Sequence, residues 1–208
     1  RGVLMADSKT QAKWDAAAAS YDLMASFGVE KRWKAGKEAF FSTMDGKILF
    51  LAVGTGLDIQ CFPAGKDITG IDISPKMLDK AMPRVENYPG QMTARLMDVH
   101  DMDFEDNTFD QVFTSCTFCS VPDPVKGLEG LRRVLKPGGT LKMFEHTGSR
   151  CFPFSVMLDL VNPVCRHLGP DINRDTVANV RTAGFEVNKV FNVFLDVVKF
   201  IEATAPAE

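Results

Sequence analysis

The most constraining feature of the chain is an apolar run that leads directly into a glycine turn. The run KILFLAV (47–53) is apolar at almost every position, as expected for a parallel strand covered on both faces. Gly54-Thr55-Gly56 follows at once. Glycine lets the backbone turn tightly there and bring its N–H groups close to a ligand. A strand that ends in this way indicates an open α/β sheet that binds a ligand at the carboxyl ends of its strands.

Strand-like and helix-like segments alternate along the rest of the chain. This alternation predicts an α/β, Rossmann-like, doubly wound fold with a mostly parallel seven-stranded sheet. The closing segment 186–204 predicts two strands that turn around Asn192, and therefore a C-terminal antiparallel strand. Ser74-Pro75 and Asp123-Pro124 are typical helix starts. The expected strands are 47–53, 67–72, 91–99, 109–116 and 140–146, and the expected helices are 8–24, 29–44, 75–85, 124–135 and 174–185.

We expect one principal domain with short additions, because 208 residues fit a single core. Residues 1–45 form the expected helical cap, and residues 46–208 form the ligand-binding domain. Within that domain, segment 151–168 is inserted after the fifth strand and is rich in Phe, Met, Leu and Val. It suits a lid over an apolar ligand, and it suits an ordinary core helix equally well.

Composition and charge argue against several classes of protein. With a net charge of −3 the chain has no excess of Lys and Arg to replace phosphate counterions, so we expect no nucleic-acid partner. No apolar run approaches the roughly 18 residues that cross a bilayer, and the first residues do not resemble a signal peptide. The five cysteines are irregularly spaced, and Cys116 and Cys119 lack a second pair, so we expect reduced thiols and no metal site. These features predict a cytoplasmic protein, with peripheral contact at a membrane surface left open.

Two aspartates at neighbouring strand ends favour an adenosine-containing ligand. Asp72 lies at the end of the second strand, 16 residues after Gly56. A carboxylate there can accept hydrogen bonds from both hydroxyls of a ribose. Asp98, at the end of the third strand, can meet the exocyclic amine of an adenine. The turn lacks the GxGxxG spacing that a pyrophosphate requires, so NAD is the poorer candidate; the remaining alternative is a tight turn without a ligand.

Several linked motifs in 47–146 carry a resemblance to a known family. The run ILFLAVGTGLD, ITGIDISPKML, MDVHDMDFEDNTFDQVFTSCTFCSVPDP and LRRVLKPGGTLKMFEH resembles the class I S-adenosylmethionine-dependent methyltransferases. It is similar in particular to the branch of the quinone C-methyltransferases, the bacterial phosphatidylethanolamine N-methyltransferases and the human alkyl-thiol methyltransferases. The resemblance implies S-adenosylmethionine as cofactor, and it implies that Tyr21 closes the cofactor pocket. It further implies a cofactor site made of Ala52, Gly54, Thr55 and Gly56 at the turn, Asp72 at the ribose, Ile73 and Met77 in the adenine slot, Asp98 and Val99 at the adenine edge, and Cys116 beside the donor carbons.

The turn departs from the pattern of this family at two positions. Phe50 stands where an acidic residue is usual, and Ala52 stands where the first glycine is usual. We expect weakened or rearranged cofactor binding rather than its loss, because the ribose and adenine contacts remain. The alternative is a module that binds the cofactor without catalysis.

Methyl transfer needs few catalytic side chains, because the sulfonium already carries an activated methyl group. Holding the acceptor in line with that methyl can supply most of the catalysis. Glu145-His146, just beyond the fifth strand, is the best-placed pair for proton transfer, with Tyr21 as a further candidate. The alternative is that Glu145 only caps a loop and His146 packs against it.

Two segments bear on the nature of the acceptor, although their patterns are less specific than the motifs of the cofactor site. The segment EKRWKAGK (30–37) predicts a basic, aromatic helix face that can lie on anionic lipid headgroups, or else a solvated surface with Trp33 turned inward. Together with the apolar segment 151–168 it favours a lipid or small apolar acceptor, with the nitrogen of phosphatidylethanolamine as the first candidate. A quinone-precursor carbon and an alkyl thiol are alternatives, and a nicotinamide oxidoreductase is a third class. The sequence does not constrain the oligomeric state.

Overall fold

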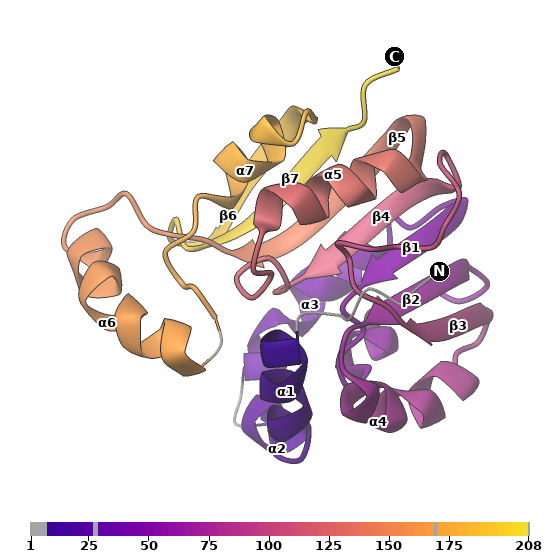
Figure 1. The fold of residues 1–208 in the computed structure, drawn as a ribbon, viewed down its shortest axis with the longest axis horizontal. Coiled ribbons are helices and arrows are strands. Elements are labelled where there is room, and N and C mark those ends of the chain that lie inside the picture. Colours follow the sequence, from indigo (N-terminus) through magenta and orange to yellow (C-terminus); the bar gives the residue numbers. More distant parts are fainter. Residues whose placement is uncertain (1–7, 27–28, 169, 208) are drawn as a thin grey trace. The chain divides into compact units, whose positions relative to one another are not determined.

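The chain forms an α/β fold with one seven-stranded sheet (Figure 1). The structure, a computed structural model, describes residues 8–26, 29–168 and 170–207. The strand order is β3-β2-β1-β4-β5-β7-β6. The backbone divides into two compact units, residues 1–103 with 109–111 and residues 104–108 with 112–208. The predicted fold class is confirmed, whereas the predicted division at residue 45 stays a prediction.

The first unit consists of three parallel strands with helices. In β1, β2 and β3 the register pairs Lys47 with Asp67 and Asp67 with Gln91, so the carboxyl ends of the three strands lie at one edge. The single-turn helix η1 directly follows the glycine turn. The elements are α1 (Ser8–Ala17), α2 (Tyr21–Ser26), α3 (Val29–Phe41), β1 (Lys47–Leu51), η1 (Leu57–Cys61), β2 (Asp67–Asp72), α4 (Pro75–Glu86) and β3 (Gln91–Leu96).

The second unit contains the antiparallel part of the sheet. Strand β7 runs antiparallel to both β5 and β6, which confirms the predicted antiparallel C-terminal strand. Strand β4 begins in the first unit and continues into the second. The elements are β4 (Phe109–Ser115), α5 (Pro124–Val134), β5 (Leu135–His146), α6 (Phe154–Leu168), α7 (Thr176–Thr182), β6 (Glu186–Phe194) and β7 (Val198–Thr204).

Local sequence signals place the helix starts correctly. The hydroxyl of Ser74 accepts a hydrogen bond from the N–H of Met77 at 3.1 Å, and the carboxylate of Asp123 accepts one from the N–H of Lys126 at 3.0 Å. In both cases a proline occupies the first helical position, where its missing N–H costs nothing.

Three boundaries differ from the sequence prediction. The helix expected at 8–24 is broken at 18–20, where the N–H of Ser20 turns back to the carbonyl of Ala17 at 3.1 Å. Residues 135–139 belong to β5, because the N–H of Gly138 and the carbonyl of Gly139 both bond to Ala205. The turn of the closing hairpin lies at 195–197, since Asn192 pairs with Lys199 in the sheet and Leu195 adopts a left-handed conformation (φ 47°). Strand pairing sets the last two of these boundaries, and the local sequence does not encode that pairing.

Phe50 belongs to an aromatic cluster that packs α3 against β1. Its ring lies edge-on to Phe41 and Phe62, with centroids 5.8 and 4.9 Å away, and all three side chains are buried. Phe40 and Tyr88 extend the cluster. A carboxylate at position 50 would be desolvated there, so the aromatic side chain stabilises the packing of α3 where the family usually has charge.

Ala52 adopts a backbone conformation that favours glycine, the residue that the family resemblance implies at this position. Its φ is 60°, in the left-handed region, and Gly54 and Gly56 follow at 58° and 84°. The Cβ of an L-residue crowds the backbone in this region, at a cost of about 1–2 kcal/mol. The turn therefore retains its path but carries local strain.

Replacing Ala52 by glycine should therefore stabilise the chain. We expect Ala52→Gly to raise the free energy of unfolding by about 1 kcal/mol, measured by urea denaturation. Ala94→Gly, the same change at a regular position of β3, should lower it by about 0.5–1 kcal/mol. A loss of stability in both variants would contradict the assignment of strain to Ala52.

Candidate active site

The glycine turn in the first unit offers open space for a ligand. A Cβ added to Gly54 would find no atom within 4 Å, so a bound molecule can approach the backbone closely there. At Gly56 the same Cβ would come within 3.1 Å of Ile59 and 3.3 Å of Ala81, so this glycine serves the packing of η1 against α4. The carbonyl of Thr55 accepts a hydrogen bond from Arg84 at 2.6 Å, which fixes the turn to α4.

Asp72 links the end of β2 to the glycine turn. Its carboxylate accepts hydrogen bonds from the N–H of Gly54 at 2.7 Å and from the N–H of Ser74 at 2.9 Å. Burial raises the pKa of Asp72, although backbone N–H groups oppose that shift. A carboxylate can accept about four hydrogen bonds, so capacity remains for a ribose hydroxyl. Asp72, the predicted partner of the ribose, therefore lies at the same sheet edge as the glycine turn.

The remaining adenine-side residues also lie at this edge. Asp98 accepts hydrogen bonds from the backbone N–H of His100 at 2.9 Å and contacts His100 Nδ1 at 2.7 Å. His100 thereby holds the carboxylate that we expect at the adenine amine. Ile73 is half-buried beside Asp72, whereas Met77 and Val99 are buried.

Polar contacts join the N-terminal helices to the cofactor edge of the sheet. Asp22 of α2 pairs with Arg84 at 2.8 Å, and Arg84 in turn reaches Thr55 of the glycine turn. Asp15 of α1 accepts a hydrogen bond from the hydroxyl of Ser74 at 2.5 Å. Tyr21, next to Asp22, is half-buried and lies edge-on to Trp14. These contacts place α2 at the glycine turn, as a residue that closes the cofactor pocket requires, and the role of Tyr21 stays a prediction.

The basic helix face predicted for 30–37 is smaller in the structure. Lys37 is only 6% exposed and pairs with Asp58 of η1 at 2.6 Å, so it joins α3 to the glycine turn. Arg32 and Lys34 are exposed, with Arg32 stacked 5.1 Å from the ring centroid of Trp33. The side chains of Glu30 and Lys31 lie outside the described residues. Amphipathic spacing alone did not distinguish the buried lysine from its exposed neighbours.

In the second unit, Glu145 organises the loop that follows β4. The side chain is fully buried, and its oxygens accept hydrogen bonds from the hydroxyl of Thr114 at 2.7 Å, the N–H of Thr117 at 2.9 Å and the N–H of Phe118 at 3.1 Å. Burial raises the pKa of Glu145 to about 7. This geometry gives Glu145 a positioning role, as in the predicted alternative of a loop cap. A direct proton-transfer role stays a prediction.

His146 has the properties of a neutral base. Burial and the charge of Lys199 lower the pKa of His146, so its imidazole is neutral at pH 7. Its Nδ1 is buried, and in the part of the chain that the structure describes it has no hydrogen-bond partner. Because this nitrogen is buried, an acceptor does not reach it in this conformation, and the proton-transfer role of His146 stays a prediction.

Cys116 lies at the end of β4, directly before the loop that Glu145 holds. Its φ is 52°, and its N–H donates to the carbonyl of Phe144 at 2.8 Å. The residue is exposed, whereas Cys119 is buried. A left-handed conformation at a non-glycine residue is typical of functional sites whose surroundings enforce it.

Arg174 also contacts this loop, although no sequence pattern indicates it. Its guanidinium donates to the carbonyls of Phe118 (2.9 Å) and Val121, and so supports the loop whose N–H groups Glu145 holds. Arg174 follows this loop by more than 50 residues. No local spacing indicates such a contact, and only the fold brings the two segments together.

Comparisons with known proteins agree with this geometry. Residues 49–143 match the family model described as a methyltransferase domain. A ubiquinone/menaquinone biosynthesis C-methyltransferase of Geotalea daltonii is 33% identical over 68% of this chain and 65% of its own length. A phosphatidylethanolamine N-methyltransferase of Cereibacter sphaeroides is 32% identical over 69% of each chain. A human thiol S-methyltransferase is 30% identical over 74% of this chain and 69% of its own length.

Two solved structures share the fold. An S-adenosylmethionine-dependent methyltransferase of Aquifex aeolicus superimposes with a TM-score of 0.64 at 19% identity, over 84% of this chain and 92% of its own. A phosphoethanolamine N-methyltransferase of Haemonchus contortus, solved with phosphomonomethylethanolamine and S-adenosylhomocysteine, also gives a TM-score of 0.64. It is 18% identical and covers 84% of this chain and 53% of its own.

The chain belongs to the class I S-adenosylmethionine-dependent methyltransferases. Within that class it is similar to the branch of the quinone, phosphatidylethanolamine and thiol methyltransferases. The predicted family, enzyme class and cofactor are thereby confirmed. The chain spans 65% of the length of the quinone relative, and the three relatives differ in acceptor, so the acceptor is a matter for proposal.

The residues of the first unit fit this cofactor. The space beside Gly54 admits a ligand against the backbone, and Asp72 and Asp98 present carboxylates at the same sheet edge. Gly54, Asp72 and Asp98 would hold the nucleoside and methionine parts. When bound, S-adenosylmethionine supplies an activated methyl group on its sulfonium.

Loss of the Asp72 carboxylate should weaken cofactor binding. We expect Asp72→Ala to reduce the affinity for S-adenosylhomocysteine by about 1.5–3 kcal/mol in calorimetry, the range for hydrogen bonds to a charged group. Asp67→Ala, at the opposite and exposed end of β2, should leave the affinity unchanged. An Asp72→Ala variant that binds as tightly as the wild type would show that this residue does not hold the ribose.

The buried Glu145 should make stability depend on pH. Its pKa is about 7 in the folded chain and about 4.3 when unfolded, so the folded state holds the proton more tightly. The stabilising effect is fully present below pH ~4 and is lost as pH rises through 7.

Between pH 5 and pH 8 the wild type should therefore lose roughly 2–3 kcal/mol more unfolding free energy than Glu145→Gln, measured by urea denaturation. Glu129→Gln, an exposed change on α5, should follow the wild type. Parallel pH profiles for the wild type and Glu145→Gln would contradict the raised pKa.

Proposed function

We propose that this methyltransferase acts on a lipophilic acceptor at a membrane surface, with the nitrogen of phosphatidylethanolamine as the first candidate. The observation that carries the proposal is the exposed apolar surface of α6. Leu160 is 75% exposed, and Val164 is 63% exposed. Further exposed apolar side chains on this helix and just before it are Phe152, Phe154, Val156, Met157 and Val161.

Polar side chains of α6 face the rest of its unit instead. Asn162 contacts Asp171 at 2.9 Å and accepts a hydrogen bond from the N–H of Ile172 at 2.9 Å. Asp159 bonds to Asn173. A surface helix in water normally presents the opposite arrangement, with its apolar stripe toward the core. An apolar face of this size suits a lipid phase.

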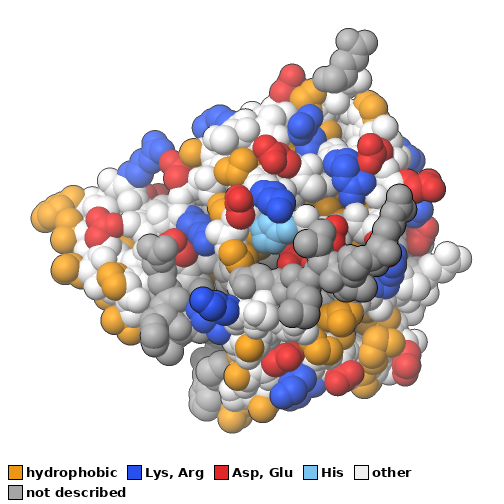
Figure 2. All heavy atoms as spheres, in the orientation of Figure 1, with side chains coloured by type: hydrophobic (Ala, Val, Ile, Leu, Met, Phe, Trp, Pro, Cys, Tyr) orange, Lys and Arg blue, Asp and Glu red, His pale blue; other side chains and the backbone are white. Residues whose placement is uncertain are grey.

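The position of α6 and its apolar surface can be seen in Figures 1 and 2. Figure 1 draws the helix apart from α5 and α7 of the same unit. In Figure 2 hydrophobic side chains gather where α6 lies. None of the helices in the described ranges combines the length and apolar character that crossing a bilayer requires. We therefore propose peripheral contact, in which α6 rests on the membrane surface.

The chemistry of the second unit supports an acceptor that loses a proton. Methylation of an amine or a thiol requires the acceptor atom to present a lone pair, and a neutral imidazole can remove its proton. His146 carries such an imidazole, and because its Nδ1 is buried the proton would have to go to Nε2. An amine therefore ranks above a carbon acceptor. An alkyl thiol is the second candidate, because the human relative is named for thiol S-methylation.

The membrane proposal is tested with vesicles of phosphatidylethanolamine and phosphatidylcholine. We expect Leu160→Ser combined with Val164→Ser to weaken sedimentation with vesicles at least about tenfold, because each side chain loses roughly 1.5–3 kcal/mol of burial. Leu96→Ser, an equally drastic change at an exposed leucine of β3, should have no effect. Equal binding by all variants would remove α6 as the docking surface.

The acceptor is tested by transfer of a labelled methyl group. Phosphatidylethanolamine in vesicles, a quinone precursor and an alkyl thiol are supplied separately, and we expect label in the phospholipid. Label only in the thiol or the quinone precursor would replace the first candidate. Tight binding of S-adenosylhomocysteine without transfer to any acceptor would instead favour a cofactor-binding module without catalysis.

A further inference from the structure

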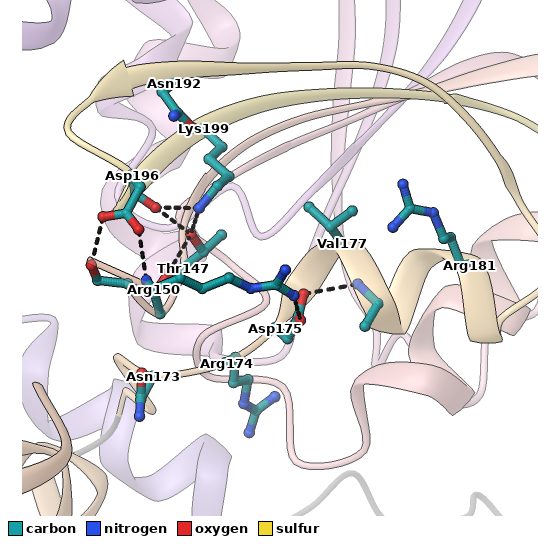
Figure 3. Close-up of a pocket in the computed structure, with 13 residues that line it drawn as sticks. Thr147, Arg150, Asn173, Arg174, Asp175, Val177, Arg181, Asn192, Asp196 and Lys199 are labelled. Atoms are coloured by element: carbon teal, nitrogen blue, oxygen red, sulfur yellow. Dashed lines mark hydrogen bonds and ion pairs between the residues drawn. The ribbon is translucent and has the colours of Figure 1, made fainter. Parts of the chain in front are cut away.

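A cavity of about 430 Å³, lined mostly by polar and charged residues, opens in the second unit directly after His146. A cavity of this size accommodates a small organic ligand. The segment 147–150 after β5, the approach to α7 and the β6–β7 hairpin form its walls (Figure 3). Its lining includes Thr147, Ser149, Arg150, Asn173, Arg174, Asp175, Arg181, Asn192, Asp196 and Lys199.

Basic side chains outnumber acidic ones in this lining. Arg150, Arg174, Arg181 and Lys199 carry positive charge, whereas only Asp175 and Asp196 carry negative charge. Both carboxylates are already engaged in holding the backbone. Asp175 caps α7 by accepting from the N–H of Ala178 at 3.0 Å, and Asp196 accepts from the N–H of Arg150 at 2.6 Å.

Two of the cations are not neutralised by an ion pair. Lys199 donates to the hydroxyl of Thr147 at 2.5 Å and to the carbonyl of Asp196, and neither acceptor carries a charge. Arg181 lies on α7, and the described residues provide no hydrogen-bond or ion-pair partner for its guanidinium. Arg150, by contrast, reaches Asp175 at 2.8 Å. Arg174 is paired as well, with Asp171 at 3.6 Å, and the negative charge of Asp196 acts on Lys199, so the cavity presents an excess of about one positive charge to a ligand.

We propose that this cavity binds the phosphate group of the methyl acceptor. The phosphate of a phospholipid is a diester with one negative charge, and a soluble phosphate monoester carries about −1.5 to −2 at pH 7, so either source has the charge sign that the cavity favours. Guanidinium groups also suit phosphate oxygens geometrically, and a lysine adds a point charge. The position directly after His146 places the phosphate near the proposed base.

The electrostatics around His146 agree with this placement. The positive charge of Lys199 contributes to lowering the pKa of His146, so the two side chains are close enough to sense one another. Burial also lowers the pKa of Lys199 itself. A bound anion would favour the charged form of Lys199, as Asp196 and Asp175 already do. The inference rests on the proposed function in one respect, namely that the occupant is the acceptor.

Two sources could supply such a phosphate: the headgroup of a phospholipid and a water-soluble phosphate ester. Inorganic phosphate, O-phosphoethanolamine, ethanolamine and phosphatidylethanolamine vesicles serve as probes in calorimetry and sedimentation. We expect the phosphate-bearing probes to bind and ethanolamine not to bind. Tighter binding of O-phosphoethanolamine than of vesicles would identify the soluble ester, and the reverse order would identify the lipid headgroup.

Two variants with a matched control locate the site. Arg181→Gln and Lys199→Gln should each weaken binding of the phosphate probes about tenfold, the scale of one charge-assisted hydrogen bond. Lys126→Gln, on the exposed first turn of α5, removes the same charge outside the cavity and should bind like the wild type. Arg181 is exposed, so its replacement leaves the core intact.

The outcomes separate this inference from the proposed function. Absence of phosphate binding in the wild type, or equal weakening by Lys126→Gln, would overturn the cavity as the phosphate site. Methyl transfer to an acceptor without phosphate, with S-adenosylhomocysteine still bound, would then leave the methyltransferase assignment standing. All variants should bind S-adenosylhomocysteine with wild-type affinity, because the predicted cofactor contacts of Gly54, Asp72 and Asp98 lie in the first unit.

Discussion

The hydrogen bonds of the Asp72 carboxylate are the interaction on which the cofactor edge depends. One oxygen holds the N–H of Gly54, and the other holds the N–H of Ser74, which caps α4. A single buried side chain thus fixes the turn after β1 and the start of the helix after β2. Arg84 and Asp15 extend the connection to the N-terminal helices. The site is therefore organised before any ligand arrives, which lowers the ordering cost of binding.

The two departures from the family pattern have separate physical explanations. Phe50 exchanges a charge for packing in the aromatic cluster with Phe41 and Phe62. Ala52 retains the left-handed backbone of a glycine and accepts strain in return. Neither change blocks the space beside Gly54. Compared with the usual pattern of the family, the turn lacks a carboxylate, whereas its backbone path is the one that glycine allows.

Much of this organisation is predictable from sequence because it is local. The caps at Ser74 and Asp123, the apolar strand before the glycine turn and the aspartate that ends β2 each follow from neighbouring residues. The long-range features do not: the burial of Lys37 against Asp58, the support of the 116–121 loop by Arg174, and the shift of the closing turn from Asn192 to 195–197. Each of these depends on a partner far away in the chain. The catalytic role of Glu145 and His146 stays a prediction. Only the structure separates a buried carboxylate that holds a loop at Glu145 from an imidazole at His146 whose Nδ1 has no hydrogen-bond partner among the described residues.

The outward-facing apolar side chains of α6 also bear on how the protein behaves once it is isolated. Hydrophobic area of this kind in water favours association with any available apolar partner. In a lipid-free buffer, detergent micelles or a second copy of the chain would compete for the same helix. The apparent molecular mass in solution is thus expected to vary with the amphiphile present. An oligomer observed without lipid would then reflect contacts between the exposed apolar side chains of α6, and these contacts would be absent when the helix lies on lipid.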